Sequence, residues 1–495
     1  MVCKIKCAAI TGIDTQPVIV ETDICNGLPS FDMVGLLASN IKESRERVRT
    51  AIKNSGFMIP PKRITINFSP ANIRKTGTYF DLPVAVSILM SMGLINCTVD
   101  DKMFIGELSL NGDIVKINGV LPLALSAMEQ GIKKCYVPIE NVGECDFIKD
   151  LEIIGVENLN QLVMILTTNM KPPEIKIIPQ ETEDYKYDFK NIKGQIQARK
   201  ASEIAAAGMH NMLMMGSPGV GKSIIAKTMP SILPDMTLEE QIEISKIQSV
   251  AGNLSGSLVK TRPVRSPHHT ATVSAMIGGG FNPKPGEITQ AHGGILFLDE
   301  LPEFSRQVIE TLEDEKIIVS RSGGTYEFPA KFILIGAMNP CKCGYYPDMN
   351  KCTCTEQEVK KYMEKISGPL IDRIDLCVHM NQVTYFQLEK EEQPEDSLTI
   401  KERVNRAVQI QRERYANEKF KFNSQLSGEN IKKYCKLNKE EQHLMEKIYT
   451  TMDLSIRAYD KIIKVARTIA DLKQHEKIQQ GDIAEAVSYR PVLFK

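Results

Sequence analysis

Short alternating runs of apolar and polar residues dominate the first 165 or so residues of the chain. In residues 62–68 (KRITINF), isoleucines alternate with polar residues, and this period of two predicts a strand. Residues 40–55 place apolar residues on one face and charges on the other, which predicts a helix. Asn111-Gly112 lies between two β-rich runs and predicts a hairpin. The patterns also predict a helix over 121–130 and a strand over 134–137.

Changes in composition divide the chain into three predicted domains. An α/β domain over residues 1–166 ends where prolines and charges gather, and this texture predicts a linker over 167–190. A second α/β pattern occupies residues 191–385. Strand patterns then stop, and residues 386–495 are predicted to form a C-terminal helical lid. Its helices are predicted over 400–417, 427–433, 439–452, 455–472 and 481–488, the last with a capping pair formed by Asp482 and Glu485.

The composition is that of a globular protein. The chain has 495 residues, of which 42% are apolar and 25% charged. Lys+Arg and Asp+Glu both total 61, so a nucleic-acid partner would need a local basic patch or a ring assembly. No signal-peptide pattern and no apolar run of membrane-spanning length is present, so we expect a cytoplasmic protein without a membrane partner. Most of its twelve cysteines should then be reduced.

A phosphate-binding loop stands at residues 216–223, which have the pattern G-x-x-x-x-G-K-S. An apolar strand pattern precedes it and a helical pattern follows, as such a loop requires. Its backbone N–H groups wrap the phosphates of ATP, its lysine reaches the terminal phosphates, and its serine ligates Mg²⁺. The predicted nucleotide-binding residues of this loop are Gly216, Ser217, Pro218, Gly219, Val220, Gly221, Lys222 and Ser223.

Two later strand ends carry polar side chains that suit ATP hydrolysis. The apolar run in GGILFLDE (293–300) is typical of a buried parallel strand and ends in Asp299 and Glu300. We predict that Asp299 holds Mg²⁺ and that Glu300 polarises the attacking water. The alternative is a core strand that ends in a salt bridge. A further strand, KFILIGA (331–337), leads to Asn339, which we predict to orient the same water.

Two arginines are candidates for contacts with the γ-phosphate. Arg373 lies among apolar residues in SGPLIDRIDL, and an arginine supplied by a neighbouring subunit stabilises the transition state of phosphoryl transfer. Alternatively, Arg373 forms a surface salt bridge with Asp372 or Asp375. Arg457 stands near the start of the amphipathic segment 454–472, where a lid arginine can reach the γ-phosphate in cis or from a neighbour.

These segments resemble AAA+ ATPases of the magnesium-chelatase-like branch, and most of all the ComM/YifB family. Residues 261–304, ISGPLIDRIDL and AYDKIIKVARTIADL carry the likeness. The resemblance implies a homo-hexameric ring with ATP at the subunit borders. It also implies a motor that remodels DNA by branch migration, in recombination or in the uptake of transforming DNA. The implied catalytic residues are Glu300, Asn339, Arg373 as arginine finger and Arg457 as second sensor, beside Lys222, Ser223 and Asp299.

The N-terminal half resembles the domain shared with Lon proteases, which has a ribosomal-protein-S5-like fold. Segments 27–36, 41–50 and 75–90 carry this likeness. A Lon-type protease is therefore an alternative, but it needs a serine nucleophile, and Tyr79 stands where that serine would be. A binding or ring-scaffolding role fits better. The charged stretch 42–49 is either a DNA or subunit contact or a solvated helix face.

A cysteine cluster and a histidine pair supply further candidate sites. Two C-x-C pairs, Cys341 with Cys343 and Cys352 with Cys354, have the chemistry of a structural Zn²⁺ site, although reduced thiols or redox-sensitive pairs are alternatives. His268 and His269 would face opposite ways on a strand, so joint metal binding is not expected. They belong to a basic loop, with Arg262 and Arg265, that either lines a pore and meets phosphates or serves the fold alone.

Two other function classes remain open beside a DNA motor. A chelatase-type ATPase would remodel a protein partner for Mg²⁺ insertion into a porphyrin. The Lon-like half speaks against it, because the family comparison implies that chelatase ATPase subunits lack that half. An ATP-gated scaffold with little motor output is the third class, and the intact Glu300 and Arg373 speak against it. The response of the ATPase rate to forked or four-way DNA separates these functions.

Overall fold

A computed structural model describes residues 2–168, 170–173, 185–280, 283–321, 324–383 and 394–490, with residues 39, 40 and 42 described by their backbone alone. Residues 169 and 174–184 of the predicted linker and residues 386–393 and 491–495 of the predicted lid lie outside the described residues. None of the described helices is long and apolar enough to cross a bilayer.

The N-terminal part contains a seven-stranded mixed sheet. Antiparallel pairing joins the first two strands and the fourth, whereas the remaining pairs are parallel. Buried and less buried residues alternate along the segment predicted as a strand over 62–68, which confirms that prediction. The strand order is β3 (Ser30–Val34), β4 (Arg63–Ser69), β2 (Asp14–Cys25), β1 (Cys3–Thr11), β5 (Lys102–Phe104), β8 (Lys134–Pro138) and β9 (Glu152–Val156).

Helices and one small hairpin complete this part. The predicted helices and the Asn111-Gly112 hairpin are confirmed, but the β-rich run before this turn, residues 103–110, is divided between two sheets. The first residues of this run join the large sheet, whereas Glu107 and Leu108 pair across the turn. Gly106 packs tightly between Leu82 and Ile114 and separates these two segments. The elements are α1 (Ser39–Asn54), α2 (Asp81–Ser91), α3 (Val120–Glu129), α4 (Leu159–Thr168), η1 (Ile139–Glu144), β6 (Glu107–Leu108) and β7 (Ile114–Val115).

The central part is built on a five-stranded sheet in which every pairing is parallel. Strand residues alternate between two cores: Met212 and Met214 face one cluster, and Leu213 and Met215 face the other. Burial on both faces explains the continuous apolar runs in the sequence. The strand order is β11 (Val264–Arg265), β14 (Ile295–Leu298), β17 (Ile333–Met338), β10 (Met212–Gly216) and β18 (Leu376–Met380).

Short helices and hairpins surround this sheet. They are η2 (Phe189–Asn191), α5 (Ile196–Gly208), α6 (Lys222–Thr228), η3 (Met229–Ile232), α7 (Leu238–Ala251), α8 (Val273–Ile277), α9 (Glu287–Gln290), η4 (Leu301–Glu303), α10 (Arg306–Thr311), α11 (Glu356–Met363), α12 (Gly368–Ile371), β12 (Gly278–Gly279), β13 (Lys284–Pro285), β15 (Lys316–Arg321) and β16 (Gly324–Pro329).

The C-terminal part is helical, as predicted, and shares one apolar core with the central sheet. The cap expected from Asp482 and Glu485 is wrong. Gln479 caps the last helix and Asp482 completes its capping box, while Glu485 pairs with Lys473 at 2.9 Å, because the helix begins before the predicted start. The elements are α14 (Ser397–Arg414), η5 (Asn423–Gln425), α15 (Glu429–Tyr434), α16 (Lys439–Thr451), α17 (Ile456–Leu472) and α18 (Gln480–Ser488).

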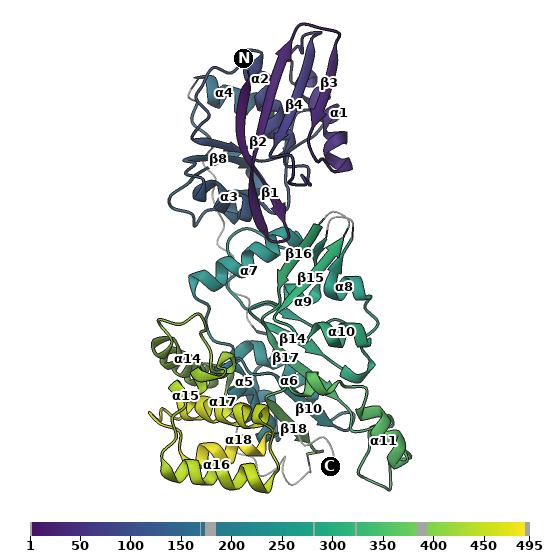
Figure 1. Cartoon of the computed structure of the whole chain (residues 1–495), viewed down its shortest axis with the longest axis vertical. Coiled ribbons are helices and arrows are strands. Elements are labelled where there is room, and N and C mark those ends of the chain that lie inside the picture. Colours follow the sequence, from purple (N-terminus) through teal and green to yellow (C-terminus); the bar gives the residue numbers. More distant parts are fainter. Residues whose placement is uncertain are drawn as a thin grey trace.

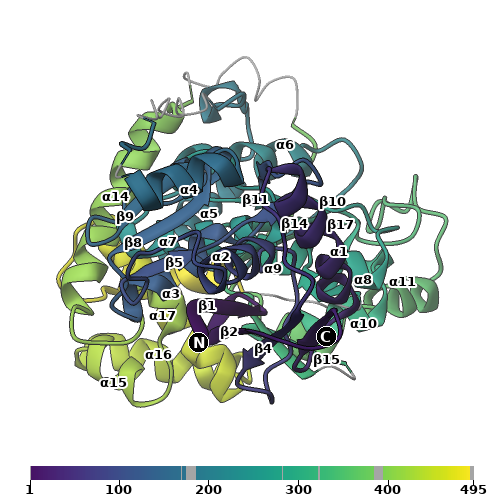
Figure 2. The ribbon, with the colours of Figure 1, turned by 90° about the horizontal axis from the view of Figure 1, so that it is seen from above.

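The N-terminal part lies at one end of the long axis of the molecule, and the central and C-terminal parts lie side by side at the other end (Figure 1). Figure 1 shows the N-terminal sheet at one end, with the β15–β16 hairpin of the central part directed toward it. The turn between β1 and β2 meets this hairpin, since a Cβ placed on Gly12 would lie 3.1 Å from the Glu327 carbonyl oxygen. In both views, α11 and the C-terminal helices lie on opposite sides of the central sheet (Figures 1 and 2).

Candidate nucleotide site and cysteine cluster

The phosphate loop joins the end of β10 to the start of α6. Its lysine is the first residue of that helix and is almost fully buried. The Lys222 ammonium group donates hydrogen bonds to the carbonyl oxygens of Gly216 (2.6 Å) and Ser217 (3.0 Å) and to Oδ1 of Asn339 (3.0 Å). Burial lowers the pKa of Lys222, and the nearby Asp299 carboxylate acts in the opposite direction. The lysine of the loop and the amide after β17 therefore lie in direct contact.

The remaining polar groups of the candidate site follow β14. The Ser223 hydroxyl donates to Oδ2 of Asp299 at 2.9 Å, and Oδ1 of Asp299 accepts from the Glu300 N–H at 3.0 Å. A hydroxyl and a carboxylate are oxygen ligands of the kind that Mg²⁺ takes, so these two side chains fit the predicted metal. Glu300 has a left-handed backbone (φ 53°) and a side chain that is 55% exposed, so its carboxylate is accessible to water.

A histidine that the sequence did not connect with this site contacts Glu300. Nδ1 of His269 lies 3.2 Å from Oε2 of Glu300. The rings of His268 and His269 lie side by side, with their centroids 4.2 Å apart. The expectation that they face opposite ways is wrong, because these residues lie beyond the end of β11, where the chain turns. No motif in the sequence marks His269 as a partner of Glu300.

The two candidate arginines lie elsewhere. Both line a cavity of about 470 Å³ between the central sheet and the C-terminal helices, and none of the phosphate-loop residues lines it. Arg457, which is 76% exposed, pairs with Asp372 at 3.0 Å. Arg373 donates to the carbonyl oxygen of Leu312, and burial lowers the pKa of Arg373. Among the ion pairs of the described residues, Asp372 pairs with Arg457 and Asp375 pairs with His210, and neither pairs with Arg373.

The two arginines of the predicted basic loop before β14 are held by partners within the fold. Arg262 is buried and donates to the carbonyl oxygens of Pro234 and Gly293, and it forms an ion pair with Glu240 at 3.0 Å. Arg265 donates to the side chain of Gln290. These contacts favour the structural interpretation of both arginines over phosphate binding.

The turn compared with that of Lon proteases has a structural role. The Tyr79 hydroxyl is buried and accepts the Ile10 N–H at 2.9 Å, and burial raises the pKa of Tyr79. Lys75 is also buried and donates to the carbonyl oxygen of Pro70. With no serine between residues 75 and 81 and both polar groups engaged, this turn holds no serine–lysine pair of the Lon type.

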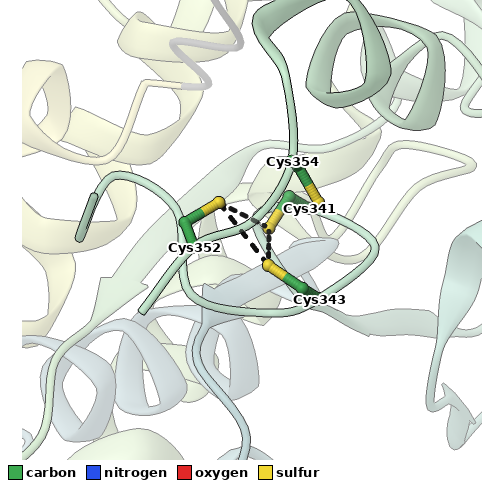
Figure 3. Close-up of side chains that lie close together, drawn as sticks. All are labelled: Cys341, Cys343, Cys352 and Cys354. Carbon is green, nitrogen blue, oxygen red and sulfur yellow. Dashed lines mark hydrogen bonds between the residues drawn. The ribbon is translucent and has the colours of Figure 1, made fainter. Parts of the chain in front are cut away.

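The four clustered cysteines converge in the loop between β17 and α11, as Figure 3 shows. Their sulfur atoms all lie within 4.8 Å of one another. None of the twelve cysteines, all of which lie in the described residues, forms a disulfide. The sequence predicted this grouping, whereas its contact with the phosphate loop, described below, was not predicted.

Comparisons with known proteins identify the family. The model for magnesium chelatase, subunit ChlI, matches residues 188–388, its C-terminal model matches 394–490, and a model for subunit ChlI of Mg-chelatase matches 20–141. Competence protein ComM of Haemophilus influenzae is 37% identical, and protein YifB of Escherichia coli 38% identical, each covering 98% of this chain and 96% of the relative. The chain belongs to the ComM/YifB family. It is therefore a magnesium-chelatase-like AAA+ protein.

One distant relative extends the comparison beyond this family. A protein named probable DNA helicase MCM9 of Arabidopsis thaliana is 26% identical over 46% of this chain and 29% of its own length. In the other direction, a model named for a chelatase subunit also matches the N-terminal half of this ComM/YifB member. The name of that model does not say whether chelatase ATPase subunits carry this half, so the expectation that this half speaks against a chelatase-type function stays a prediction.

Proposed function

We propose that this ComM/YifB member is a ring-forming ATPase that couples ATP hydrolysis to DNA remodelling of the branch-migration or helicase type. The observation that supports hydrolysis is the convergence of one lysine, one hydroxyl, two carboxylates and one amide from three strand ends. They are Lys222, Ser223, Asp299, Glu300 and Asn339.

Each of these groups has a definite place in the proposed reaction. Bound Mg²⁺ would supply charge neutralisation at the phosphates, and Ser223 and Asp299 would hold it. Lys222 exchanges its carbonyl partners for terminal phosphate oxygens, while Asn339 stays beside it to fix the water opposite the leaving group. Glu300 orients that water and accepts its proton, and the contact with His269 positions the carboxylate.

The positions of the arginines support assembly into a ring. Arg373 and Arg457 line a cavity away from the phosphate loop of their own chain. An arginine in trans stabilises the transition-state charge of phosphoryl transfer. We therefore propose that both serve the ATP of a neighbouring subunit, in a homo-hexamer of the kind that the family resemblance implies.

DNA as the partner is supported by the relatives named for competence and for DNA helicase activity. Because Lys+Arg and Asp+Glu are equal in number, binding must use a local surface. The β15–β16 hairpin carries exposed Lys316 and Arg321, although Lys316 also pairs with Glu327 at 3.1 Å. Contacts of this kind read the phosphate backbone, so DNA binding should weaken steeply with salt. A cytoplasmic location is part of the same proposal.

The test is the ATPase rate of the full chain with and without four-way DNA, beside a strand-exchange assay. We expect DNA to stimulate hydrolysis and ATP to drive branch migration, with Glu300→Gln as the inactive control. The names of the three matched chelatase models favour a second function, remodelling of a protein partner for Mg²⁺ insertion. An ATPase that ignores DNA and moves no branch point would reject the DNA motor and leave that function and the ATP-gated scaffold.

A further inference from the structure

The sulfur atoms of the cysteine loop have the spacing of a metal ligand shell. Sγ of Cys341 lies 3.3 Å from Sγ of Cys343 and 3.8 Å from Sγ of Cys352, and the last two are 3.5 Å apart. Cys354 completes a set in which all sulfur atoms lie within 4.8 Å. A Zn–S bond of about 2.3 Å sets the S···S edges of a tetrahedron at about 3.8 Å. A disulfide would instead need a separation of about 2.05 Å.

The loop has little else to hold it. Residues 339–355 contain no helix or strand, and long loops of this kind inside a domain require another source of order. The only apolar cluster formed by the described loop residues consists of the thiols themselves, with Tyr346 and with Val359 of α11. Met349, the largest aliphatic side chain of the loop, is 72% exposed. A metal ion is the usual replacement for such a missing core.

The donor set also selects the kind of metal. It contains four sulfurs and no carboxylate or imidazole, and the backbone N–H of Tyr346 donates to Sγ of Cys341 at 3.4 Å, which favours a thiolate there. A closed set of four thiolates suits a structural Zn²⁺ rather than a catalytic metal with an open position. We propose that Cys341, Cys343, Cys352 and Cys354 bind one structural Zn²⁺.

The bound ion would fix one wall of the nucleotide site. A Cβ placed on Gly344 would lie 2.7 Å from Cδ of Pro218 in the phosphate loop and 3.8 Å from Cγ of Asn339. The cysteine loop is therefore packed directly on the phosphate loop, between the second and third metal ligands. We infer that Zn²⁺ holds Gly344 in this contact, so that metal loss loosens the phosphate loop. This step rests on the proposed nucleotide site, whereas zinc binding does not.

Metal analysis of the full chain, purified without chelators, tests zinc binding directly. We expect about one zinc per chain, and markedly less in Cys343→Ser and Cys354→Ser, whose thiols are only partly buried. Cys25→Ser is the matched control, because Cys25 is an exposed thiol at the end of β2, and it should retain the full zinc content. A folded wild-type protein with less than about 0.2 zinc per chain, or with iron in its place, overturns the proposal.

A second measurement needs no variant. Titration of the folded wild-type protein with a thiol-specific mercurial, in the presence of a zinc-sensitive dye, should release the zinc as about four thiols react in addition to the exposed Cys25. Zinc that remains bound after the cluster thiols have reacted overturns the assignment of these ligands. Both measurements are independent of ATP hydrolysis, so failure of the proposed DNA motor would leave their outcome unchanged.

Discussion

Replacing Gly344 with alanine changes the contact between the cysteine loop and the phosphate loop by one methyl group. Gly344 has a left-handed backbone (φ +89°), and its added Cβ would lie 2.7 Å and 2.9 Å from Cδ and Cγ of Pro218. Carbon atoms pack at about 3.5–4.0 Å, so one of the two loops must move by roughly 1 Å. The proline ring resists rotation about its own φ, and in our proposal Zn²⁺ restrains the cysteine loop.

Two costs follow from this geometry. The left-handed conformation costs alanine about 1–2 kcal/mol relative to glycine, which lowers the free energy of unfolding. Overpacking of the new methyl group against Pro218 costs about 1–3 kcal/mol more, and this overpacking cost strains the phosphate loop. If this strain is relieved only by opening the phosphate loop, the affinity for ATP falls by about 5- to 150-fold.

Equilibrium binding of a fluorescent ATP analogue with Mg²⁺ measures this loss, and metal analysis shows whether zinc is retained. Gly481→Ala is the matched control, because Gly481 lies in α18 and a Cβ there meets no atom within 4 Å. We expect the control to bind nucleotide like the wild type. An affinity of Gly344→Ala within about twofold of wild type, in folded and zinc-loaded protein, would refute the mechanical link between the two loops.

Further predictions concern the proposed catalytic groups. Lys222→Ala should abolish nucleotide binding in equilibrium titrations, because its charge and its phosphate contacts are lost together. Glu300→Gln should bind ATP with wild-type affinity but stop hydrolysis in a phosphate-release assay. His269→Ala should lower kcat about tenfold with little change in ATP affinity, since it frees the Glu300 carboxylate, whereas the control His268→Ala should retain most activity. Arg373→Ala should be inactive alone, and mixing it with Lys222→Ala subunits should restore some ATPase activity. Normal ATPase activity in assembled Arg373→Ala rings would refute the assignment of Arg373 as the arginine finger.

Features set by local sequence were predictable. The alternation around Ile64 and the turn at Asn111-Gly112 depend on residues close together in the chain, and both elements are present. The start of α18 was misplaced because Gln479 is an unusual capping residue, so the acidic residue that completes the box was mistaken for the cap.

The sequence predicted the residues of the candidate site but not their mutual contacts. Lys222 and Ser223 belong to one local motif, and Asp299 and Asn339 end apolar strands, so each could be named without knowing the strand order. Their mutual contacts depend on β17 lying between β10 and β14, which no local pattern specifies.

The contacts that sequence could not supply depend on turns and tertiary packing. His269 reaches Glu300 only because the chain turns after β11, and Gly344 meets Pro218 only because the cysteine loop folds back over the phosphate loop. Neither contact has a periodic or motif signal, since both join irregular segments that are distant in the chain.

The arrangement of the arginines bears on how a complete site would form. The ion pair between Arg457 and Asp372 is exposed, and such pairs contribute only about 0–1 kcal/mol, so Arg457 can exchange Asp372 for a phosphate at little cost. Arg373 is held by the carbonyl oxygen of Leu312, a neutral acceptor, whereas a phosphate would add an opposite charge and could accept two of its N–H groups at once. Both arginines are therefore held by partners weaker than the ligand we propose for them. Because neither lies at the phosphate loop of its own chain, we infer that subunit assembly completes the hydrolytic site, so an isolated subunit would bind ATP but hydrolyse it slowly.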